Sequence, residues 1–288
     1  MPEAKERTLI SFDWAMKSIL RDKANFDVLE GFLSTLLARE IRVLSLLESE
    51  GNARYADEKF NRVDLAVVDE QEQIMLIEIQ HDLDIHHLKR LLYGASKLIT
   101  DHLGRGRPYA EVKQVISISI VYFQVLEKPE DYIYHGYTEF YGWHTHRPLA
   151  KASGLPLPEA KWMENDTQAI FPEYFLIDVA SFPNIVHSAI DEWVYMFKNS
   201  AIRDDFRAKN IQSAREKLDY LRMDESERQA YEEYMFSRAI QESVLQSAFT
   251  SGRTEEKYET ARKMKAKGLD LTLIAEISGL SEAEILAL

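Results

Sequence analysis

The sequence contains no cysteine, which excludes disulfide bonds and every metal site built on thiolate ligands. It also lacks any apolar run near the roughly 18 residues that a membrane-spanning helix needs. The first residues, Met1 to Arg7, carry no apolar core of the kind that secretory signals have. These absences predict a cytoplasmic protein that does not enter a membrane.

Positive charge is scarce. The 35 Lys and Arg residues stand against 48 Asp and Glu residues, for a net charge of -13. This balance argues against a protein that binds nucleic acid through bulk electrostatic attraction. It does not exclude a nuclease, since metal-binding carboxylates and a local basic strip can coexist on an acidic body. The 288 residues, 45% of them hydrophobic, suffice for one large or two small domains with a real core.

Hydrophobic periodicity predicts an α/β protein with a mixed central sheet flanked by helices. Helical spacing occupies residues 8–24, 25–39, 83–103, 184–199, 210–222 and 225–267. Strand patterns occupy residues 41–47, 62–69, 73–80, 114–123, 132–134, 137–143 and 174–179. We therefore expect a sheet-containing core over residues 1–183 and a helical C-terminal region over residues 184–288.

The central prediction is a β-hairpin. Its two strands are rich in Val, Ile and Leu, and polar residues separate them. If residues 70–72 form the loop, Asp69 faces Gln73, and the same register puts Asp64 opposite Glu78.

This register gathers polar side chains at one end of an otherwise apolar sheet face, because side chains alternate across a strand. The group comprises Asp64, Glu78, Gln80 and Arg62. Of these, Arg62 would contact the substrate. Two carboxylates and the backbone carbonyl of Ile79 could hold Mg²⁺, with Mn²⁺ or another divalent cation as alternatives. Such an ion lowers the pKa of a bound water and stabilises charge on a phosphoryl oxygen, and Gln80 would orient that water or contact the phosphate. The spacing alone equally allows a solvent-facing hairpin with ordinary polar positions.

Three residues of the predicted helix 83–103 share one side of it. Arg90, Tyr93 and Lys97 are spaced by three and four residues. Arg90 and Lys97 would contact a nucleic-acid backbone, and Tyr93 would support them. Alternatively, the arginine pairs with a hairpin carboxylate and the tyrosine covers the core.

Other polar residues have a chemical and a structural interpretation. Glu30, on the second predicted helix, could join a metal site, but a solvated helix charge is the favoured reading. His81, His86 and His87 are close in sequence, yet adjacent helical positions do not face each other. Surface histidines are therefore favoured over a zinc site.

The tail, with short helices expected at residues 271–277 and 281–288, resembles a helix-turn-helix. Its second helix carries Glu282 and Glu284 and no basic residue, which is a poor surface for phosphates. We favour a packing or oligomerisation role. The preceding helix has mixed charges suited to a helical partner, so a homo-oligomer through the C-terminal helices is expected.

Three motifs and the order of elements resemble the PD-(D/E)XK nuclease superfamily. The motifs are Arg62-Val63-Asp64, Ile77-Glu78-Ile79-Gln80 and Lys89-Arg90-Leu91-Leu92-Tyr93. The resemblance is closest to the recombination-promoting nuclease branch, whose members are also described as transposases. Phe12-Asp13-Trp14-Ala15-Met16-Lys17 resembles that branch's D-x-x-F-K start, with Met16 where Phe is commoner. The resemblance to the family covers about residues 10–125 well and the helical tail more loosely.

The resemblance places the family's first acidic position on Asp64, its second on Glu78 and its lysine position on Gln80. The branch commonly carries glutamine there. The proline of the superfamily name is absent, since Val63 precedes Asp64. The resemblance implies a restriction-endonuclease-like core that cleaves DNA with a divalent metal, in recombination or mobile elements. A catalytically inactive scaffold that binds DNA or a protein partner is the alternative, and an enzyme acting on RNA is a third.

Overall fold

The computed structural model describes residues 9–47, 65–103, 106–147 and 170–288. The chain forms two compact units, residues 1–223 and 224–288. Among the described residues, no helix is both long and apolar enough to cross a membrane. The cytoplasmic location stays a prediction.

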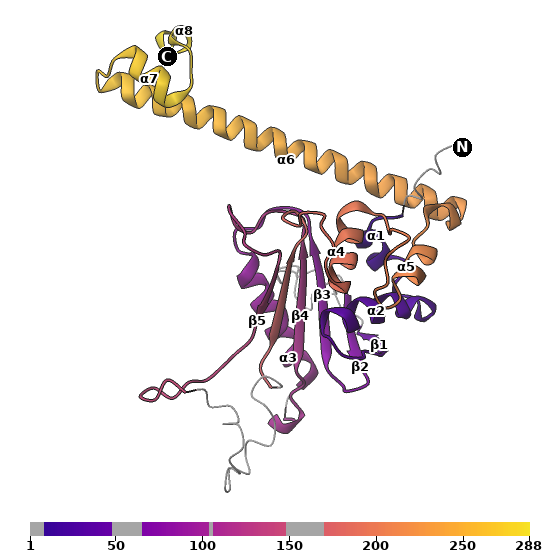
Figure 1. Ribbon diagram of the computed structural model, residues 1–288. Helices are drawn as coiled ribbons and strands as arrows, with labels where there is room; N and C mark the ends of the chain where they lie inside the picture. The colour runs from indigo at the N-terminus through magenta and orange to yellow at the C-terminus, as the bar shows by residue number, and fades with distance from the viewer. Residues whose placement is uncertain (1–8, 48–64, 104–105, 148–169) are drawn as a thin grey trace. The chain divides into compact units, whose positions relative to one another are not determined.

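The first unit is a mixed sheet with helices packed around it, as the sequence predicted (Figure 1). Its strands are β1 (Val43–Leu47), β2 (Leu65–Asp69), β3 (Ile74–Gln80), β4 (Val115–Val121), β5 (Ile133–Gly136) and β6 (Glu173–Asp178). Its α-helices are α1 (Phe12–Lys17), α2 (Phe26–Leu36), α3 (His87–Leu103), α4 (Ala189–Asn199) and α5 (Ile211–Lys217). The strand order is β1-β2-β3-β4-β6-β5. Strands β3, β4 and β6 run parallel, and the other pairs are antiparallel.

Two predicted elements differ from the structure. The first helix spans only Phe12–Lys17, and the Ser18 hydroxyl then donates to the Trp14 carbonyl at 2.7 Å. The Ser18 and Ile19 N–H groups still bond four residues back, and the helical pattern ends where the Leu20 N–H bonds to the Ala15 carbonyl, five residues back, at 2.8 Å. The strand predicted at residues 137–143 does not form, because the chain leaves the sheet after Gly136.

The predicted register of the central hairpin is confirmed where its residues are described. Leu65 pairs with Ile77 and Val68 pairs with Ile74 across β2 and β3. Asp64 and Arg62 lie outside the described residues, so their placement opposite Glu78 and Gln80 stays a prediction.

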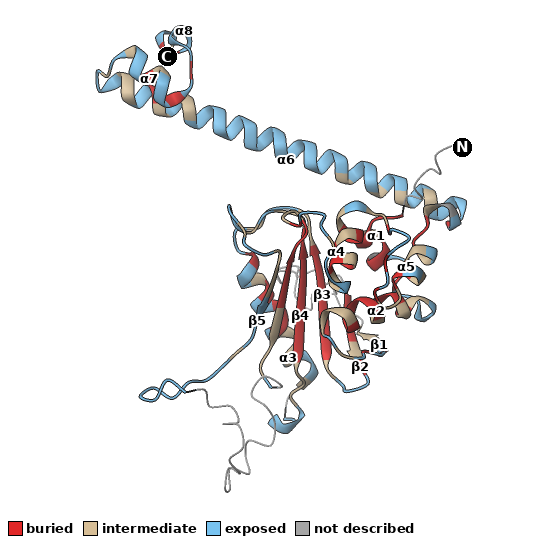
Figure 2. Ribbon diagram, viewed as in Figure 1, coloured by how far each residue is buried: buried red, intermediate tan, exposed pale blue. Residues whose placement is uncertain are grey.

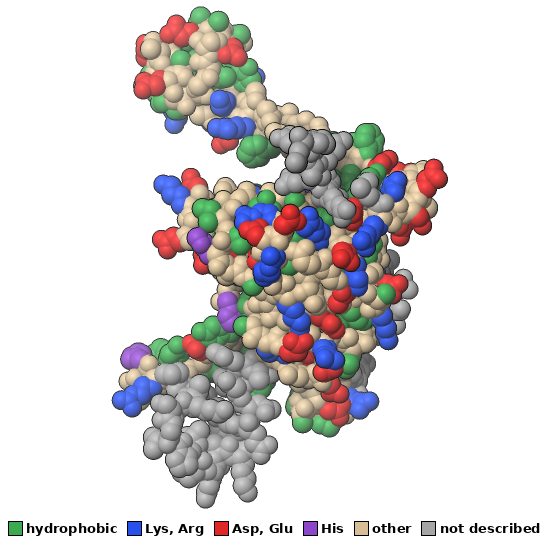
Figure 3. Space-filling view, turned by 45° about the vertical axis from the view of Figure 1, so that its right-hand side comes forward, with side chains coloured by type: hydrophobic (Ala, Val, Ile, Leu, Met, Phe, Trp, Pro, Cys, Tyr) green, Lys and Arg blue, Asp and Glu red, His purple; other side chains and the backbone are tan. Residues whose placement is uncertain are grey.

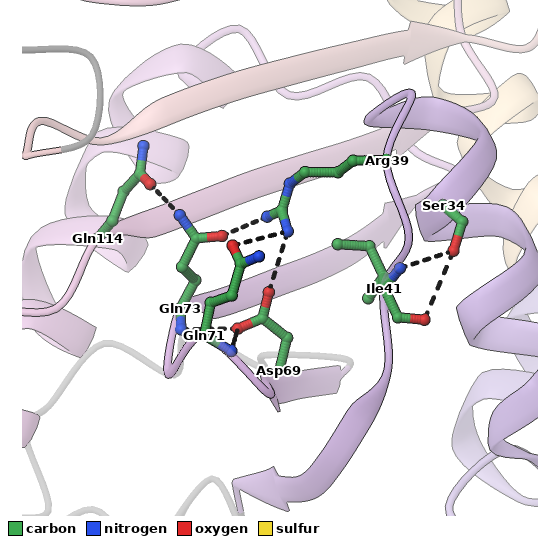
Figure 4. Close-up of polar contacts among 7 residues, drawn as sticks. All are labelled: Ser34, Arg39, Ile41, Asp69, Gln71, Gln73 and Gln114. Carbon is green, nitrogen blue, oxygen red and sulfur yellow. Dashed lines mark hydrogen bonds and ion pairs between the residues drawn. The ribbon is translucent and has the colours of Figure 1, made fainter. Parts of the chain in front are cut away.

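A polar network around one buried carboxylate fixes the turn of this hairpin (Figure 4). The Asp69 carboxylate, 1% exposed, accepts hydrogen bonds from the backbone N–H groups of Gln71 and Gln73, both at 2.9 Å. The Arg39 guanidinium reaches the same carboxylate at 3.4 Å. Glu72 adopts a left-handed φ of 60° within the turn. Asp69 therefore stabilises the hairpin turn at the end of β2, beside the start of β3 and far from Glu78 near the end of β3.

Both sheet faces are covered, which is why the middle strands are red along their length in Figure 2. On one face, Ala95 of α3 packs in a cluster with Ile74 and Val115. On the other face, the Tyr122 hydroxyl after β4 donates to the Phe197 carbonyl of α4 at 3.1 Å.

Aromatic contacts join the helices of that second face. The Phe32 ring of α2 lies 5.1 Å from the ring of Phe197 and 5.9 Å from that of Trp193. Phe12 of α1 packs 4.4 Å from Phe197. Helices α4 and α5 thus belong to the first unit, and the compact units divide after residue 223 rather than after 183.

The second unit consists of α6 (Glu225–Ala266), α7 (Leu271–Ser278) and α8 (Glu282–Leu286). Asp224 caps α6 in a reciprocal capping box with Glu227. Ala261 near the end of α6 packs with Ile274, Leu280 and Ile285. The two tail helices form as predicted. Ile274 and Ile285 pack in this cluster, whereas Leu273, Ile277 and Leu286 are exposed.

Replacement of Gly31 by alanine should destabilise the first unit. An added Cβ would lie 2.5 Å from the Lys209 carbonyl oxygen and 2.7 Å from the Asn210 Cβ. Overpacking costs about 1–3 kcal/mol, which outweighs the roughly 1 kcal/mol that Gly→Ala normally gains in a helix. We expect a lower Tm in thermal denaturation followed by circular dichroism.

The matched control is Gly252→Ala on α6, where an added Cβ meets nothing within 4 Å. It should leave the unfolding of the first unit unchanged. Equal Tm values for Gly31→Ala and the parent would contradict the tight packing of Gly31 against Lys209 and Asn210.

Candidate functional site

Glu78 lies near the end of β3 and is only 3% exposed, although it is a carboxylate in a central strand. Strand alternation puts its side chain on the face of Ile74, which α3 covers. Gln80 follows on the same face and is half-buried, and its amide donates to the Asp82 carbonyl at 3.2 Å. The structure thus brings Glu78 and Gln80 to one end of one face.

A serine and a histidine flank Glu78 on that face. The parallel pairing of β3 and β4 puts Ser119 beside Glu78. The Ser119 hydroxyl lies 2.8 Å from Nε2 of His87, in the first turn of α3. His87 is 7% exposed, so the surface position predicted for it is wrong. The first turn of α3 points this ring toward the sheet.

His81 occupies the opposite face because it follows Gln80 by one residue. Its Nε2 lies 3.2 Å from Oδ2 of Asp13, which is buried in α1. Its ring stacks on Tyr122 with centroids 4.2 Å apart. The prediction of a surface residue is wrong for His81 as well, whereas His86 is exposed as predicted. Asp13 and His81 join α1 to the end of β3.

The predicted helix residues spread along α3. Arg90 and Lys97 are half-buried and Tyr93 is 49% exposed. Helix α3 starts near Ser119 through His87, and its later turns pack near Ile74, at the other end of β3. Arg90 therefore lies closer to the Glu78 end of the sheet than Lys97 does.

The remaining carboxylate candidate already has a structural partner. Glu30 Oε1 accepts a hydrogen bond from the backbone N–H of Val43, at the start of β1, at 2.9 Å. Within the described ranges, no three His, Asp or Glu side chains are grouped to hold a metal ion. Asp64 is outside those ranges. Ile79 points its side chain to the opposite face, so only its backbone carbonyl can contribute to the predicted site.

The chain was compared with known proteins. Residues 10–248 match the family described as PD-(D/E)XK nuclease family transposase. The chain belongs to this family. It matches none of the curated proteins and none of the solved structures. The mixed six-stranded sheet with surrounding helices is consistent with the PD-(D/E)XK α/β fold.

Membership in the PD-(D/E)XK transposase family indicates a nuclease-like function linked to mobile elements. The match extends well past residue 125 and includes α4, α5 and part of α6. Glu78 is the residue predicted for the second acidic position of the superfamily motif, and Gln80 the residue predicted for its lysine position. Being neutral, Gln80 cannot supply positive charge itself.

The sequence does not predict Ser119 as a neighbour of this candidate site, nor the contacts that His87 and Asp13 make around it. Ser119 and His87 flank Glu78, and Asp13 holds His81. The alternation of Ser117 and Ser119 in a β-branched strand was the available signal, because it places two hydroxyls on one buried face. No short-range pattern marks the two partners from helices.

His87 should make stability depend on pH. Burial lowers the pKa of His87, the nearby Arg90 lowers it further, and Asp84 partly opposes both. The unfolded chain then binds a proton more readily than the folded one, so stability is fully present above about pH 6.5 and falls as pH decreases below it. His87→Gln keeps a hydrogen-bonding group but does not titrate. We expect its Tm to fall less than that of the parent between pH 7.5 and pH 5.5.

The control is His86→Gln, an exposed neighbour whose Tm profile should follow the parent. Parallel Tm profiles for His87→Gln and the parent would contradict a buried neutral imidazole.

Proposed function

We propose that the chain is a divalent-metal-dependent endonuclease that hydrolyses phosphodiester bonds of DNA during recombination or the movement of mobile elements. The observation that carries the proposal is the buried Glu78 carboxylate at the end of a central strand, in a PD-(D/E)XK family member.

The donor chemistry fits a hard cation. Glu78 offers carboxylate oxygens and Ile79 a backbone carbonyl oxygen, which are the ligands that Mg²⁺ and Mn²⁺ prefer. Asp64 would provide the second carboxylate. Bound by these residues, a divalent ion lowers the pKa of a water and stabilises charge on a phosphoryl oxygen.

The chain's own residues would divide the remaining tasks. Gln80 orients the attacking water or the phosphate through its amide. Arg62, Arg90 and Lys97 contact the DNA backbone, with Tyr93 supporting them. A local basic contribution of this kind is needed because the whole chain carries a net charge of -13.

We further propose that α6 mediates pairing with a second copy of the chain. Its middle exposes a set of large apolar residues: Phe236, Ile240, Val244, Leu245 and Phe249. Acidic Glu225 and Glu227 occupy its first turn and basic Lys263 and Lys265 its last. An antiparallel pair would place the acidic start of one α6 beside the basic end of the other. Light scattering on a size-exclusion column should give the mass of a dimer, and a monomer would contradict this pairing.

The test of the nuclease proposal is nicking of supercoiled plasmid by the purified chain. The parent should nick it with Mg²⁺ and not with EDTA, and Asp64→Ala should not nick it. If Asp64→Ala cuts as well as the parent, the assigned site is wrong. A parent that binds DNA and never cuts it would identify a scaffold, and preferential cleavage of matched RNA would reassign the substrate.

A further inference from the structure

The segment after β5 carries exposed aromatic side chains. We call residues 137–147 the aromatic arm. Trp143 is 86% exposed, Tyr141 58%, Tyr137 46% and Phe140 44%. Figure 1 shows the arm leaving the edge of the sheet, and Figure 2 shows it exposed along most of its length. Large rings left in water need a reason, because burying each one would be favourable.

The tip of the arm is a built turn. The Gly142 N–H donates to the Arg147 carbonyl at 2.8 Å, and the His146 N–H donates to the Gly142 carbonyl at 2.8 Å. A Cβ at Gly142 would meet Thr145 Oγ1, so the threonine side chain would have to move if another residue stood there. His146 has a left-handed φ of 52°. Trp143 is therefore displayed by a defined turn.

The side-chain composition of the arm indicates which kind of ligand it would bind. Its large apolar residues are all aromatic, with no Leu, Ile, Val or Met among residues 137–147. Every nucleobase has a π-face on which such rings stack, without regard to sequence. Histidine and arginine accompany the rings, and the one acidic residue, Glu139, accepts a hydrogen bond from the Tyr141 hydroxyl. Figure 3 shows His and basic side chains at the end of a row of hydrophobic ones.

We propose that the aromatic arm binds unpaired bases of a nucleic-acid strand by stacking, with Trp143 as its main contact. The choice of ligand rests on the proposed nuclease function. Arg147 and the two histidines can donate hydrogen bonds to a phosphate backbone, in a chain whose overall charge repels one. Bases inside a duplex are already stacked, so the arm favours single-stranded or unpaired regions.

The arm lies away from Glu78 and Gln80. Strand β5 is antiparallel to β6 and ends at Gly136, which pairs with Tyr174. Gln80 pairs with Val121, and Val121 pairs with Asp178, four residues further along β6. At about 3.3 Å per residue, the arm leaves the sheet about 13 Å from the level of Gln80. It therefore contacts nucleotides several positions from the bond to be cleaved, and its loss should raise KM more than it lowers kcat.

The experiment is fluorescence anisotropy with a labelled single strand of about 15 thymidines and a matched duplex, using the full chain without divalent metal. The parent should bind the single strand more tightly than the duplex. Trp143→Ala should weaken single-strand binding about tenfold, since stacking contributes about 1–3 kcal/mol per base. Trp143→Phe retains a ring and should bind within about threefold of the parent. Tyr109→Ala removes another ring, 87% exposed and outside the arm in the segment between α3 and β4, and should change nothing.

Salt separates stacking from charge. The slope of log affinity against log salt reports phosphate contacts, so Trp143→Ala should lower the line without changing its slope. Equal affinities of Trp143→Ala and the parent for the single strand would overturn the proposal. A Trp143→Ala variant that no longer self-associates but still binds DNA like the parent would also overturn it, because the arm would then bind another copy of the chain. A parent that binds through Trp143 and never cleaves would refute only the nuclease proposal. If the parent cleaves DNA and Trp143→Ala binds the single strand as tightly as the parent, only the proposal for the aromatic arm is refuted.

Discussion

Glu78→Gln should reduce Mg²⁺-dependent cleavage by more than about a hundredfold. The substitution keeps the volume of a side chain that is 3% exposed, so the central strand stays packed. It removes the charge that the proposed metal site needs. Replacing a residue that merely supports a metal ligand costs roughly 10- to 100-fold, and a ligand itself should cost more. The measurement is the initial rate of plasmid nicking.

Thermal denaturation with and without metal separates this effect from misfolding. A ligand that binds only the folded chain stabilises it by about 2.7 kcal/mol at a hundred times its Kd. The parent should therefore gain Tm with Mg²⁺ or Mn²⁺, whereas Glu78→Gln should keep a cooperative transition and gain nothing. A Glu78→Gln variant that nicks plasmid at the parent's rate would remove Glu78 from the site.

A chain ending at residue 183 should not fold, whereas one ending at residue 223 should. The shorter fragment lacks Trp193 and Phe197, which contact Phe32 in the helical layer. Loss of a large buried aromatic side chain costs about 3–5 kcal/mol, and a domain has only about 5–15 kcal/mol in total. The fragment also loses the carbonyls of Ser200 and Leu218, which accept from the Leu9 and Ile10 N–H groups at 3.0 and 2.9 Å.

Circular dichroism melts of the two fragments provide the measurement. The fragment of residues 1–223 should melt cooperatively, and the fragment of residues 1–183 should show no transition. If both melt at similar temperatures, α4 and α5 are accessory, and the boundary predicted from the sequence at residue 183 is the right one.

The sheet could be predicted because each strand is marked by residues that are close together in the sequence. Short runs of β-branched residues mark β2, β3 and β4, and the polar loop after Asp69 sets the hairpin register that the described residues confirm. Side-chain alternation along β3 also predicts that Glu78 and Gln80 share one face. Periodicity overestimated the first helix, which ends at Lys17, shortly before the Leu20 N–H bonds to the Ala15 carbonyl five residues back.

The surroundings of Glu78 could not be predicted, because they depend on contacts between distant segments. His87 reaches Ser119 only because α3 packs across β4, and Asp13 reaches His81 only because α1 closes the end of β3. Three histidines close in sequence are separated by the structure onto two faces and the solvent. The end of the first unit could not be predicted for the same reason. Helix α4 belongs to this unit because Phe12 and Phe32, far away in the sequence, pack against its Phe197.

A crystal of the chain soaked in Mn²⁺ tests the central claim most directly, since anomalous scattering locates the ion without reference to activity. We expect one strong peak bound by carboxylate oxygens of both Asp64 and Glu78 and by the Ile79 carbonyl, at about the 2.0–2.2 Å typical of small divalent ions. A peak that touches neither carboxylate, or two carboxylates that point away from each other with no ion between them, would contradict the account.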